Sequence, residues 1–216
     1  MYVPARFQET DASVIDRFVD GHQFATLVSY DGERPVASHL LLELQVGEGG
    51  QRFLNGHVAR ANGQWCTLLP GREVLAIFLG PDTYVSPRWY DHVNVPTWNY
   101  LAAHVYGTPR VVTDDAELRE MLRRLVGRYE AAEQGAPNPA YAFDALPAEF
   151  VGREMKGLVG FQIAVTRVET AFKLSQNRDA ADFDTIIRKL RQRADDGSRA
   201  VADAMERQRA KLFGAT

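Results

Sequence analysis

The sequence predicts an α+β fold, mainly β, in which a closed or nearly closed antiparallel barrel with flanking helices carries a C-terminal helical extension. Five or six segments rich in β-branched and aromatic residues follow one another within about ninety residues, joined by tight turns. From residue 114 the pattern changes mainly to charged segments with apolar residues at helical spacing. We therefore expect a barrel domain over residues 1–180 and a helical extension over residues 181–216.

The first half of the chain is expected to begin with a helix and to continue as strands. Thr10-Asp11 is suited to cap the helix, because apolar residues follow it at helical spacing. Asp31-Gly32 is a strong hairpin signal between two β-rich runs. Gly80-Pro81-Asp82 is expected to stop a later strand. The strands predicted here cover residues 24–30, 35–44, 52–55, 73–79, 83–86 and 99–112.

The second half is predicted to be largely helical. Asp114 begins an acidic first turn, which favours a helix reaching about Tyr129. Residues 134–139 are rich in glycine and proline and predict a loop. The remaining elements are a helix over 147–156, a strand over 158–168 and a helical tail from residue 182 with a break at Gly197. Asp179 or Asp182 is suited to cap that tail.

The segment from Gly56 to Trp65 concentrates polar side chains directly after an apolar run. If a helix begins near Val58, its free amide groups and positive dipole end lie beside His57 and Arg60, an arrangement that binds anions. His57, Arg60 and Asn62 are therefore candidates to hold a phosphate, and the Gln64 amide belongs to the same set. The alternatives are a solvated Arg60, a strand-end His57 and a Trp65 that packs in the core.

Three further segments carry candidate ligand-binding residues. On the strand with Ser38-His39-Leu40, alternation places His39 on the face opposite to Ser38 and Leu40, and small side chains would let a flat ring lie along the backbone. Pro96 fixes the start of a strand on which Trp98 and Asn99 face opposite sides. The third segment is predicted to clamp an anion or a polar ring, or else to be a solvated connection; its candidates are Lys173, Ser175, Gln176 and Arg178.

Composition excludes several classes of protein. The net charge is −3 and one cysteine, Cys66, is present, so neither a global basic field, an intrachain disulfide nor a multi-cysteine metal site is expected. Cys66 is expected to be packed rather than reactive. Dinucleotide-binding, phosphate-loop, zinc-protease and serine-hydrolase motifs do not occur, so no catalytic or metal-binding residue is predicted. Neither a signal peptide nor a membrane span is recognised, and a cytoplasmic location is expected.

Taken together, these segments resemble the PaiB-type family of FMN-binding negative transcriptional regulators. The resemblance covers nearly the whole chain, in order. The chain departs from the family's pattern at Leu41 and Gly63, which stand where proline is expected, in a short loop from Trp89 to Val95, and at Ala171-Phe172, which replaces a more aromatic pair. The matching residues are 1–4, Phe7, 38–40, 56–62, 78–81, 84–87, 89–90, 95–100, His104, Gly107 and 173–178.

The resemblance implies an FMN-binding split barrel of the pyridoxamine-phosphate oxidase type, and a homodimer with the flavin between its subunits. His57 and Arg60 would then clasp the FMN phosphate. The strand of Ser38, His39 and Leu40 would lie against the isoalloxazine ring. Trp98, Asn99 and residues 173–178 could come from the second subunit.

The function implied by the family is negative regulation of transcription. Direct DNA binding gains little support. The tail has a basic run at residues 188–193 and further basic residues at Arg207, Arg209 and Lys211, but acidic residues are interleaved among them. No helix-turn-helix is recognised. A flavin-dependent oxidoreductase is the alternative, because FMN would supply the redox chemistry. Haem binding is a weaker alternative, with His39, His57 or His104 as the axial ligand.

Overall fold

The computed structural model describes residues 1–132 and 141–214. The loop predicted over residues 134–139 lies outside the described residues. A search of the described helices finds none with the length and apolar character needed to cross a membrane.

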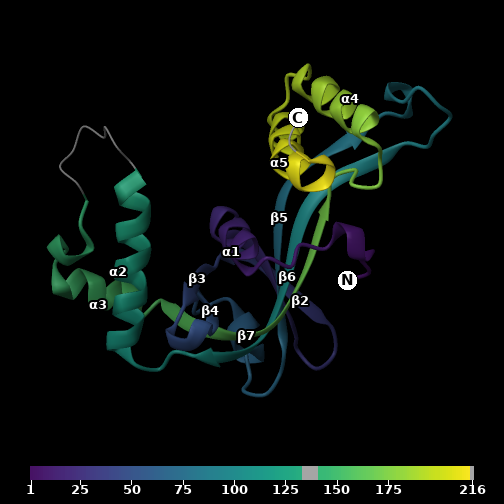
Figure 1. Cartoon of the computed structure of the whole chain (residues 1–216). Helices are drawn as coiled ribbons and strands as arrows, with labels where there is room; N and C mark the ends of the chain where they lie inside the picture. Colours follow the sequence, from purple (N-terminus) through teal and green to yellow (C-terminus); the bar gives the residue numbers. More distant parts are fainter. Residues whose placement is uncertain (133–140, 215–216) are drawn as a thin grey trace. The chain divides into compact units, whose positions relative to one another are not determined.

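The described chain forms an antiparallel seven-stranded sheet with α-helices, so the predicted mixed fold, mainly β, is confirmed. The strand order is β2-β1-β5-β6-β7-β4-β3. The strands are β1 (Phe24–Tyr30), β2 (Pro35–Leu41), β3 (Glu43–Val46), β4 (Arg52–Ala59), β5 (Val74–Val85), β6 (Thr97–Val111) and β7 (Leu158–Lys173). The α-helices are α1 (Ala12–Gly21), α2 (Asp115–Ala132), α3 (Ala148–Met155), α4 (Ala180–Arg191) and α5 (Asp196–Phe213) (Figure 1).

The chain divides into two compact units. Unit 1 contains residues 1–22, 78–104 and those from Val168 onward, and unit 2 contains residues 23–77 and 105–167. The long strands β5, β6 and β7 contribute residues to both units. The domain boundary predicted at residue 180 stays a prediction.

In unit 2 the predicted hairpin forms β1 and β2, with Tyr30 opposite Pro35. The Asp31 carboxylate accepts hydrogen bonds from the backbone N–H groups of Glu33 and Arg34, at 2.8 and 2.9 Å, and so fixes the turn. The predicted return strand to residue 44 is interrupted. The N–H of Leu42 donates to the carbonyl of Gln23 instead, at 2.9 Å, and a separate strand, β3, follows.

A second feature of unit 2 is the core beneath α2 and α3, which lie side by side in Figure 1. The predicted helix from Asp114 forms as α2, and the Asp114 carboxylate accepts the N–H of Ala116 at 3.0 Å. Apolar side chains at helical spacing meet those of α3 and the strand ends. The buried members are Val112, Leu118, Met121, Leu122, Phe143, Val151 and Met155.

In unit 1 the sequence Gly80-Pro81-Asp82 does not end a strand, so that prediction was wrong. β5 continues through it to Val85 and includes the short strand expected over residues 83–86. Gly80 is required for helix packing, because a Cβ there would lie 2.6 Å from Cε2 of Phe18 on α1. Helix α1 is capped as predicted by Asp11, whose carboxylate accepts the N–H of Ser13 at 2.8 Å.

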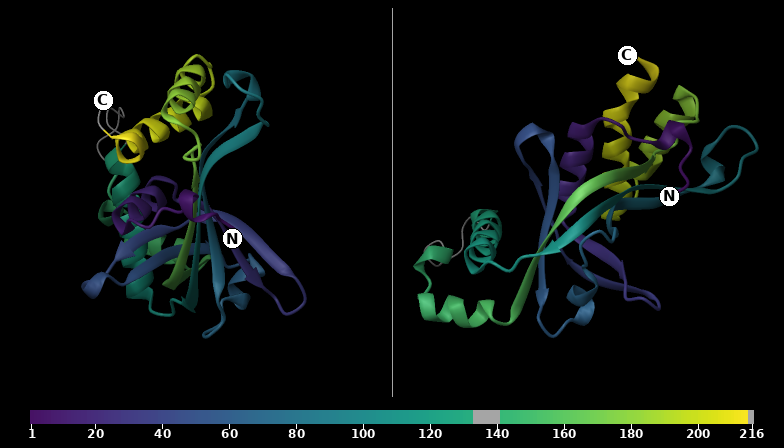
Figure 2. Two further views of the ribbon diagram at one scale, coloured as in Figure 1. Left: turned by 45° about the vertical axis from the view of Figure 1, so that its right-hand side comes forward. Right: turned by 90° about the horizontal axis from the view of Figure 1, so that it is seen from below.

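The C-terminal part of unit 1 consists of α4 packed on α5 (Figure 2). Asp179 caps α4, as one of the two predicted alternatives, by accepting the N–H of Asp182 at 2.9 Å. The predicted break at Gly197 is wrong by a few residues, since α4 ends at Arg191 and α5, capped by Asp195, includes Gly197. The buried side chains here include Phe183, Ile186, Ile187, Leu190, Val201 and Met205.

Candidate functional site

One side of the β1–β2 hairpin presents an apolar face that the described residues of unit 2 leave largely open. The register pairs Thr26 with His39 and Val28 with Ala37, and β5 extends the same face because Ile77 lies opposite Thr26. Phe24 is 73% exposed on this face. An exposed apolar surface of this kind marks a site for a ligand or a subunit. Its members are Phe24, Thr26, Val28, Tyr30, Ala37, His39, Leu41, Leu75 and Ile77, and we call it the open sheet face.

His39 is the polar residue that the sequence predicts on this face. A hydrogen bond of 2.9 Å joins its Nδ1 to Oγ1 of Thr26, which fixes the ring on the sheet. The centroid of the Phe24 ring lies 6.5 Å from that of the imidazole. Sequence reasoning missed Thr26, although the hairpin register that follows from the Asp31-Gly32 turn places it opposite His39.

Ser38 and Leu40 lie on the opposite side of β2, as the predicted alternation requires. Asn62 Nδ2 donates a hydrogen bond of 2.9 Å to Ser38 Oγ, and the side-chain Oδ1 of Asn62 accepts the backbone N–H of Gln64 at 3.1 Å. The amide of Gln64 donates to the carbonyls of Leu27 and Val36 and to Oγ of Ser29. Leu40 is buried. The structure thus joins three predicted residues, Ser38, Asn62 and Gln64, into one hydrogen-bonded cluster.

The helix expected near Val58 is absent, because β4 continues through Ala59 and a short 3-10 helix begins only at Gly63. The N–H of Arg60 donates to the carbonyl of Gly157 at 2.7 Å, so at this point the backbone still follows strand pairing rather than a helical turn. The dipole argument for an anion site beside His57 therefore does not hold. Asn62 caps the 3-10 helix instead.

His57 and Arg60 line different hollows. His57 lines a small hollow together with Asn55 and the α2 residues Met121 and Leu122, and burial lowers the pKa of its imidazole. Arg60 donates from Nε to the Lys156 carbonyl and from Nη2 to the Leu158 carbonyl, both at 2.8 Å. Arg60 also accepts a 3.0 Å hydrogen bond from the Trp65 indole at its own carbonyl. Their joint role at a phosphate stays a prediction.

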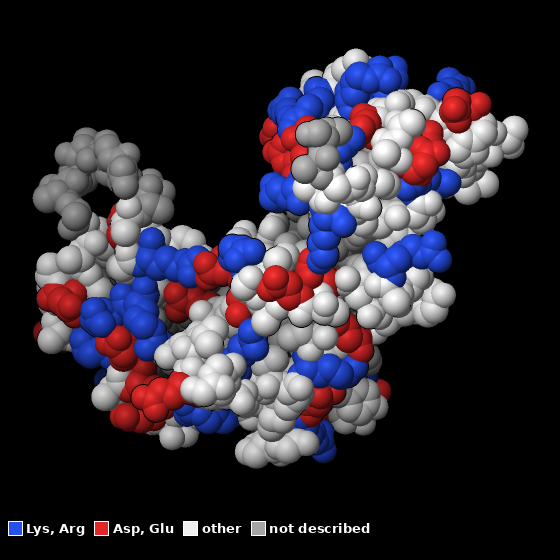
Figure 3. Space-filling model, viewed as in Figure 1, with Lys and Arg blue, Asp and Glu red and all other residues white. Residues whose placement is uncertain are grey.

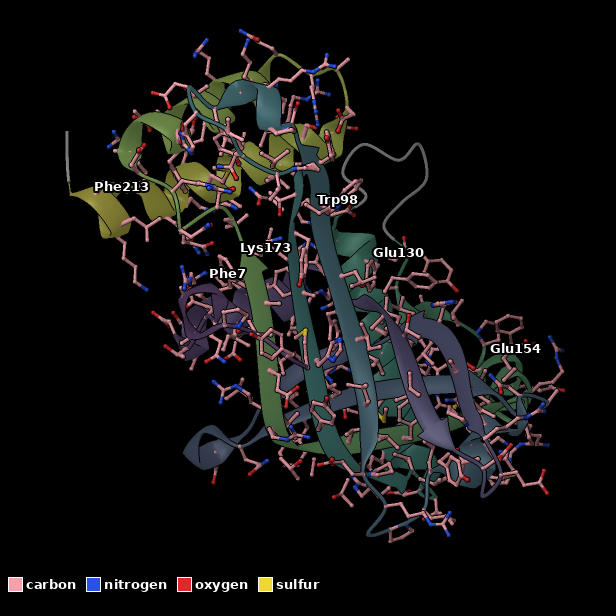
Figure 4. The ribbon with its side chains drawn as sticks, turned by 90° about the vertical axis from the view of Figure 1, so that its right-hand side faces the viewer. Phe7, Trp98, Glu130, Glu154, Lys173 and Phe213 are labelled. Carbon is pink, nitrogen blue, oxygen red and sulfur yellow. The ribbon has the colours of Figure 1, made fainter. Side chains whose placement is uncertain are left out.

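The predicted residues of the third segment lie in unit 1, where Figure 4 shows Lys173 at the end of β7 and Trp98 near the start of β6. Lys173 Nζ donates a 2.6 Å hydrogen bond to Thr97 Oγ1. Burial, and secondarily the charge of Arg178, lower the pKa of the Lys173 ammonium group. Trp98 is 48% exposed, and its indole N–H donates to Oδ1 of Asp82 at 2.8 Å.

Asn99, Ser175 and Gln176 hold the start of β6 against the segment that follows β7. The Asn99 amide lies 3.0 and 3.1 Å from Ser175 Oγ, and Asn99 is completely buried. Ser175 adopts a left-handed backbone with φ +64°, which a non-glycine residue seldom does. Gln176 accepts the Leu174 N–H and donates to the Phe172 carbonyl. These contacts give the predicted amide and hydroxyl groups a structural role.

Arg178 lies apart from that amide cluster. Its Nη2 donates to Asn94 Oδ1 at 3.1 Å, and its guanidinium carbon lies 4.6 Å from the centre of the Tyr90 ring. The buried Nε of Arg178 and the buried phenol oxygen of Tyr90 find no hydrogen-bond partner among the described residues. Tyr90 was not predicted as a site residue; its position within the matched pair 89–90 was the available signal.

Three features of unit 2 are left without partners by the contacts within the described chain. The open sheet face is largely apolar, with Phe24 and Tyr30 exposed and the small residue Ala37 among its members. Gln64 Oε1 is a buried acceptor with no partner among the described residues, and it lies on the side of β2 opposite to the open sheet face. Arg60 supplies a cation whose Nη1 makes no hydrogen bond within the described chain.

Cys66 lies in the same 3-10 helix as Gln64 and is exposed. The expectation that Cys66 is packed was therefore wrong. The helix turns Gln64 inward to the strands, and two residues further on the chain faces solvent.

Comparison with known proteins identifies relatives of this chain. A family model described as "Putative FMN-binding domain" matches residues 1–167. The Protease synthase and sporulation protein PAI 2 of Bacillus subtilis is 37% identical over 206 residues, covering 95% of this chain and 97% of that protein.

Solved structures share the fold at low sequence identity. The FAD and heme binding protein of Mycobacterium smegmatis gives a TM-score of 0.57 at 20% identity, covering 82% of this chain and 78% of that one. The flavocytochrome Anf3 of Azotobacter vinelandii gives a TM-score of 0.54 at 15% identity, covering 82% and 75%. These likenesses identify the fold as a split barrel, as predicted. The chain belongs to the PaiB-type family of proteins with the FMN-binding domain, in agreement with the resemblance of its motifs.

Proposed function

We propose that this protein binds FMN and acts, as a homodimer, as a negative regulator of transcription of the PaiB type, in a cytoplasmic setting. The observation that carries the proposal is the 37% identity to the PAI 2 protein, which extends over nearly the full length of both chains. The family model, which matches residues 1–167, supports flavin as the cofactor.

The proposed flavin site is built on unit 2. The open sheet face would take the isoalloxazine ring, with His39 as a polar contact fixed by Thr26. Arg60 and His57 are proposed to balance the phosphate charge. Gln64 is proposed to support the flavin-bearing strand from its opposite side, through its hydrogen bonds to Ser29 and to the Val36 carbonyl. Bound FMN would supply one- or two-electron redox chemistry, while these residues bind and orient it.

The proposed homodimer is supported by exposed apolar surface in each unit. In unit 2 this is the open sheet face, where Phe24 and Tyr30 are exposed. In unit 1 the segment between β5 and β6 exposes Val93 and Val95, with the exposed aromatics Tyr84 and Trp98 at its base. Surfaces of this composition are normally covered in an oligomer. We propose that Trp98, Asn99, Lys173, Ser175, Gln176 and Arg178 lie beside the flavin of the second subunit.

Regulation through direct DNA contact by the C-terminal helices has little electrostatic support. Arg191 is engaged by Asp203 and Glu206, and Arg209 is engaged by Asp184. Basic and acidic side chains alternate over α4 and α5 on the face shown in Figure 3. Charges that are neutralised within the chain contribute little to phosphate binding. We therefore propose that the flavin, rather than a basic surface of this tail, carries the regulatory signal.

The test is an absorption spectrum recorded after FMN is added to the purified protein and free flavin is removed by gel filtration. Retained bands near roughly 370 and 450 nm are expected. The Arg60→Ala variant should bind FMN at least about tenfold more weakly, since it loses a charge-assisted contact. Arg34→Ala, an exposed arginine of the hairpin turn, is the matched control and should bind normally.

The same experiment separates the alternatives. Unchanged FMN affinity in Arg60→Ala would remove Arg60 from the phosphate site. A protein that retains no flavin but shows a Soret band near roughly 400 nm would point to haem. Reduction of bound flavin by NADH or NADPH, followed by turnover with an acceptor, would favour the oxidoreductase. Light scattering coupled to the same column measures the molar mass and so tests for the dimer. A monomeric mass for the FMN-bound protein would contradict a flavin site shared between two subunits.

A further inference from the structure

A groove of about 670 Å³ lies in unit 1 between helix α1 and helix α5. The two helices lie on the same side of the strands in both views of Figure 2. The floor is apolar and is made by Phe18 of α1, Leu101 of β6, and Phe172 and Leu174 from β7 and its end. The volume falls in the range of pockets that hold small organic molecules.

Helical spacing explains why one face of each helix lines this groove. On α5, Ala200, Ala204, Arg207 and Lys211 recur every three or four residues and so share a face. On α1, Arg17 stands beside Phe18. Each helix therefore contributes apolar surface toward the floor and long basic side chains toward the rim.

The acidic residues that line the groove are already engaged within the chain. Glu9 Oε1 accepts the backbone N–H groups of Thr10 and Asp11, at 2.8 and 2.9 Å. Asp11 in turn caps α1, which lowers the pKa of its carboxyl group. Asp203 pairs with Arg191 at 2.7 Å. Each of these carboxylates thus has a hydrogen-bond donor or an ion-pair partner elsewhere in the chain, and only Asp11 also interacts electrostatically with a rim cation, Arg17.

The basic side chains of the rim, in contrast, are not held by hydrogen bonds or ion pairs. Arg17, Arg207 and Lys211 are exposed, and none of them makes a side-chain hydrogen bond or an ion pair within the described residues. The groove therefore combines an apolar floor with three cations, of which Arg17 interacts electrostatically with the Asp11 carboxylate, while Arg207 and Lys211 have no partner among the described residues. This is the complement of a molecule with an apolar body and an anionic head.

We propose that the groove between α1 and α5 binds a small organic carboxylate with an apolar body, such as an acyl or aromatic acid. Phe18, Phe172 and Leu101 would contact the apolar body, and Arg207 and Lys211 would hold the carboxylate. None of these five residues belongs to the predicted flavin set. The groove borders that set, because Leu174 on its floor lies between Lys173 and Ser175, and its lining residue Gln208 accepts a hydrogen bond from Gln176. In a regulator, such a site would receive a metabolic signal.

The test is a calorimetric titration of the full chain with decanoate, without added flavin. Saturable binding of one decanoate per chain is expected. Arg207→Ala/Lys211→Ala should weaken it about tenfold or more, because the partners of the carboxylate are lost. Decylamine, which has the same apolar body and the opposite charge, should not bind measurably. Arg199→Ala is the matched control, because Arg199 lies on the same helix and pairs with Asp196 outside the groove.

A second variant tests the cavity without touching the charges. Ala200→Trp fills the groove from its rim and should abolish decanoate binding, while circular dichroism and thermal unfolding show an intact fold. The proposal would be overturned if Ala200→Trp or the double variant bound decanoate as tightly as the wild-type protein does. It would also be overturned if the wild-type protein bound no decanoate at millimolar concentration. A change in oligomeric mass without decanoate binding would show a subunit contact instead. FMN retention, measured separately, does not bear on any of these outcomes.

Discussion

Asn62 donates a 2.9 Å hydrogen bond to Ser38, and this contact joins two predicted site segments that lie 24 residues apart in the chain. The same Asn62 side chain caps the 3-10 helix that follows β4 by accepting the N–H of Gln64. One amide therefore fixes the loop after β4 to the strand whose other face is proposed to carry the flavin ring.

Asn62→Ala is expected to lower the free energy of unfolding by about 2 kcal/mol, from the lost cap and the lost hydrogen bond together. Ser38→Ala removes only the second contact and should cost about 1 kcal/mol. Urea unfolding of the two single variants and the double variant measures their coupling. Strictly additive effects would show that the contact does not contribute to stability.

Gly107→Ala is expected to destabilise the protein by about 2 kcal/mol or more. A Cβ at this position would lie 2.4 Å from the carbonyl oxygen of Ala164, and backbone on a neighbouring strand cannot move aside easily. Gly127→Ala on α2 is the control, since nothing lies within 4 Å of its Cβ position and alanine favours the helix. Thermal unfolding distinguishes them, and a Gly107→Ala variant as stable as wild type would contradict the strand spacing.

Asn99→Asp is expected to be unstable at neutral pH and to recover part of its stability as the pH falls. Asn99 is completely buried, so the substitution places a carboxylate where only Ser175 is available as a hydroxyl partner. We expect a loss of about 3 kcal/mol at pH 7. Protonation returns a neutral side chain, and unfolding measured at pH 7 and pH 5 should show the partial recovery. Equal instability at both pH values would mean that charge is not the cause.

Stability should fall as the pH is lowered from about 6.5, the usual imidazole pKa. Burial lowers the pKa of His57, and burial together with the N-terminal ammonium lowers the pKa of His104. The folded protein therefore binds fewer protons than the unfolded chain below pH 6.5, so acid favours unfolding. His57→Gln should make the dependence shallower between pH 7 and pH 5. Above pH 7, plots of the unfolding free energy against pH should run parallel for the variant and the wild type. An unchanged slope of this plot below pH 7 would exclude His57 as a contributor to the acid sensitivity.

Local signals predicted much of the fold. The caps Asp11 and Asp179 and the turn at Asp31 were recognised because each acts within a few residues through its own side chain. The alternation of Ser38 and His39 followed from the period of a strand. In contrast, the continuation of β5 through Gly80 depends on packing against Phe18, which lies more than sixty positions away.

The site was harder to predict than the fold for the same physical reason. The sequence indicated polar residues such as Asn99, Gln64 and Ser175, but not that they would satisfy one another or the backbone. Only those donors and acceptors that make no hydrogen bond within the folded chain remain for a ligand, and local sequence does not show which ones these are. The helix expected near Val58 failed because pairing of β4 with β7 extends to Ala59, a contact across about one hundred residues.

The exposed thiol of Cys66 makes this chain suited to fluorescence work without prior mutagenesis. Because the sequence contains one cysteine, a maleimide dye would attach at a single, known position. That position is in the short helix whose Gln64 reaches into the β1–β2 hairpin. The dye would therefore act as an optical reporter of events at this loop, and its emission could be followed in real time as each candidate ligand is added.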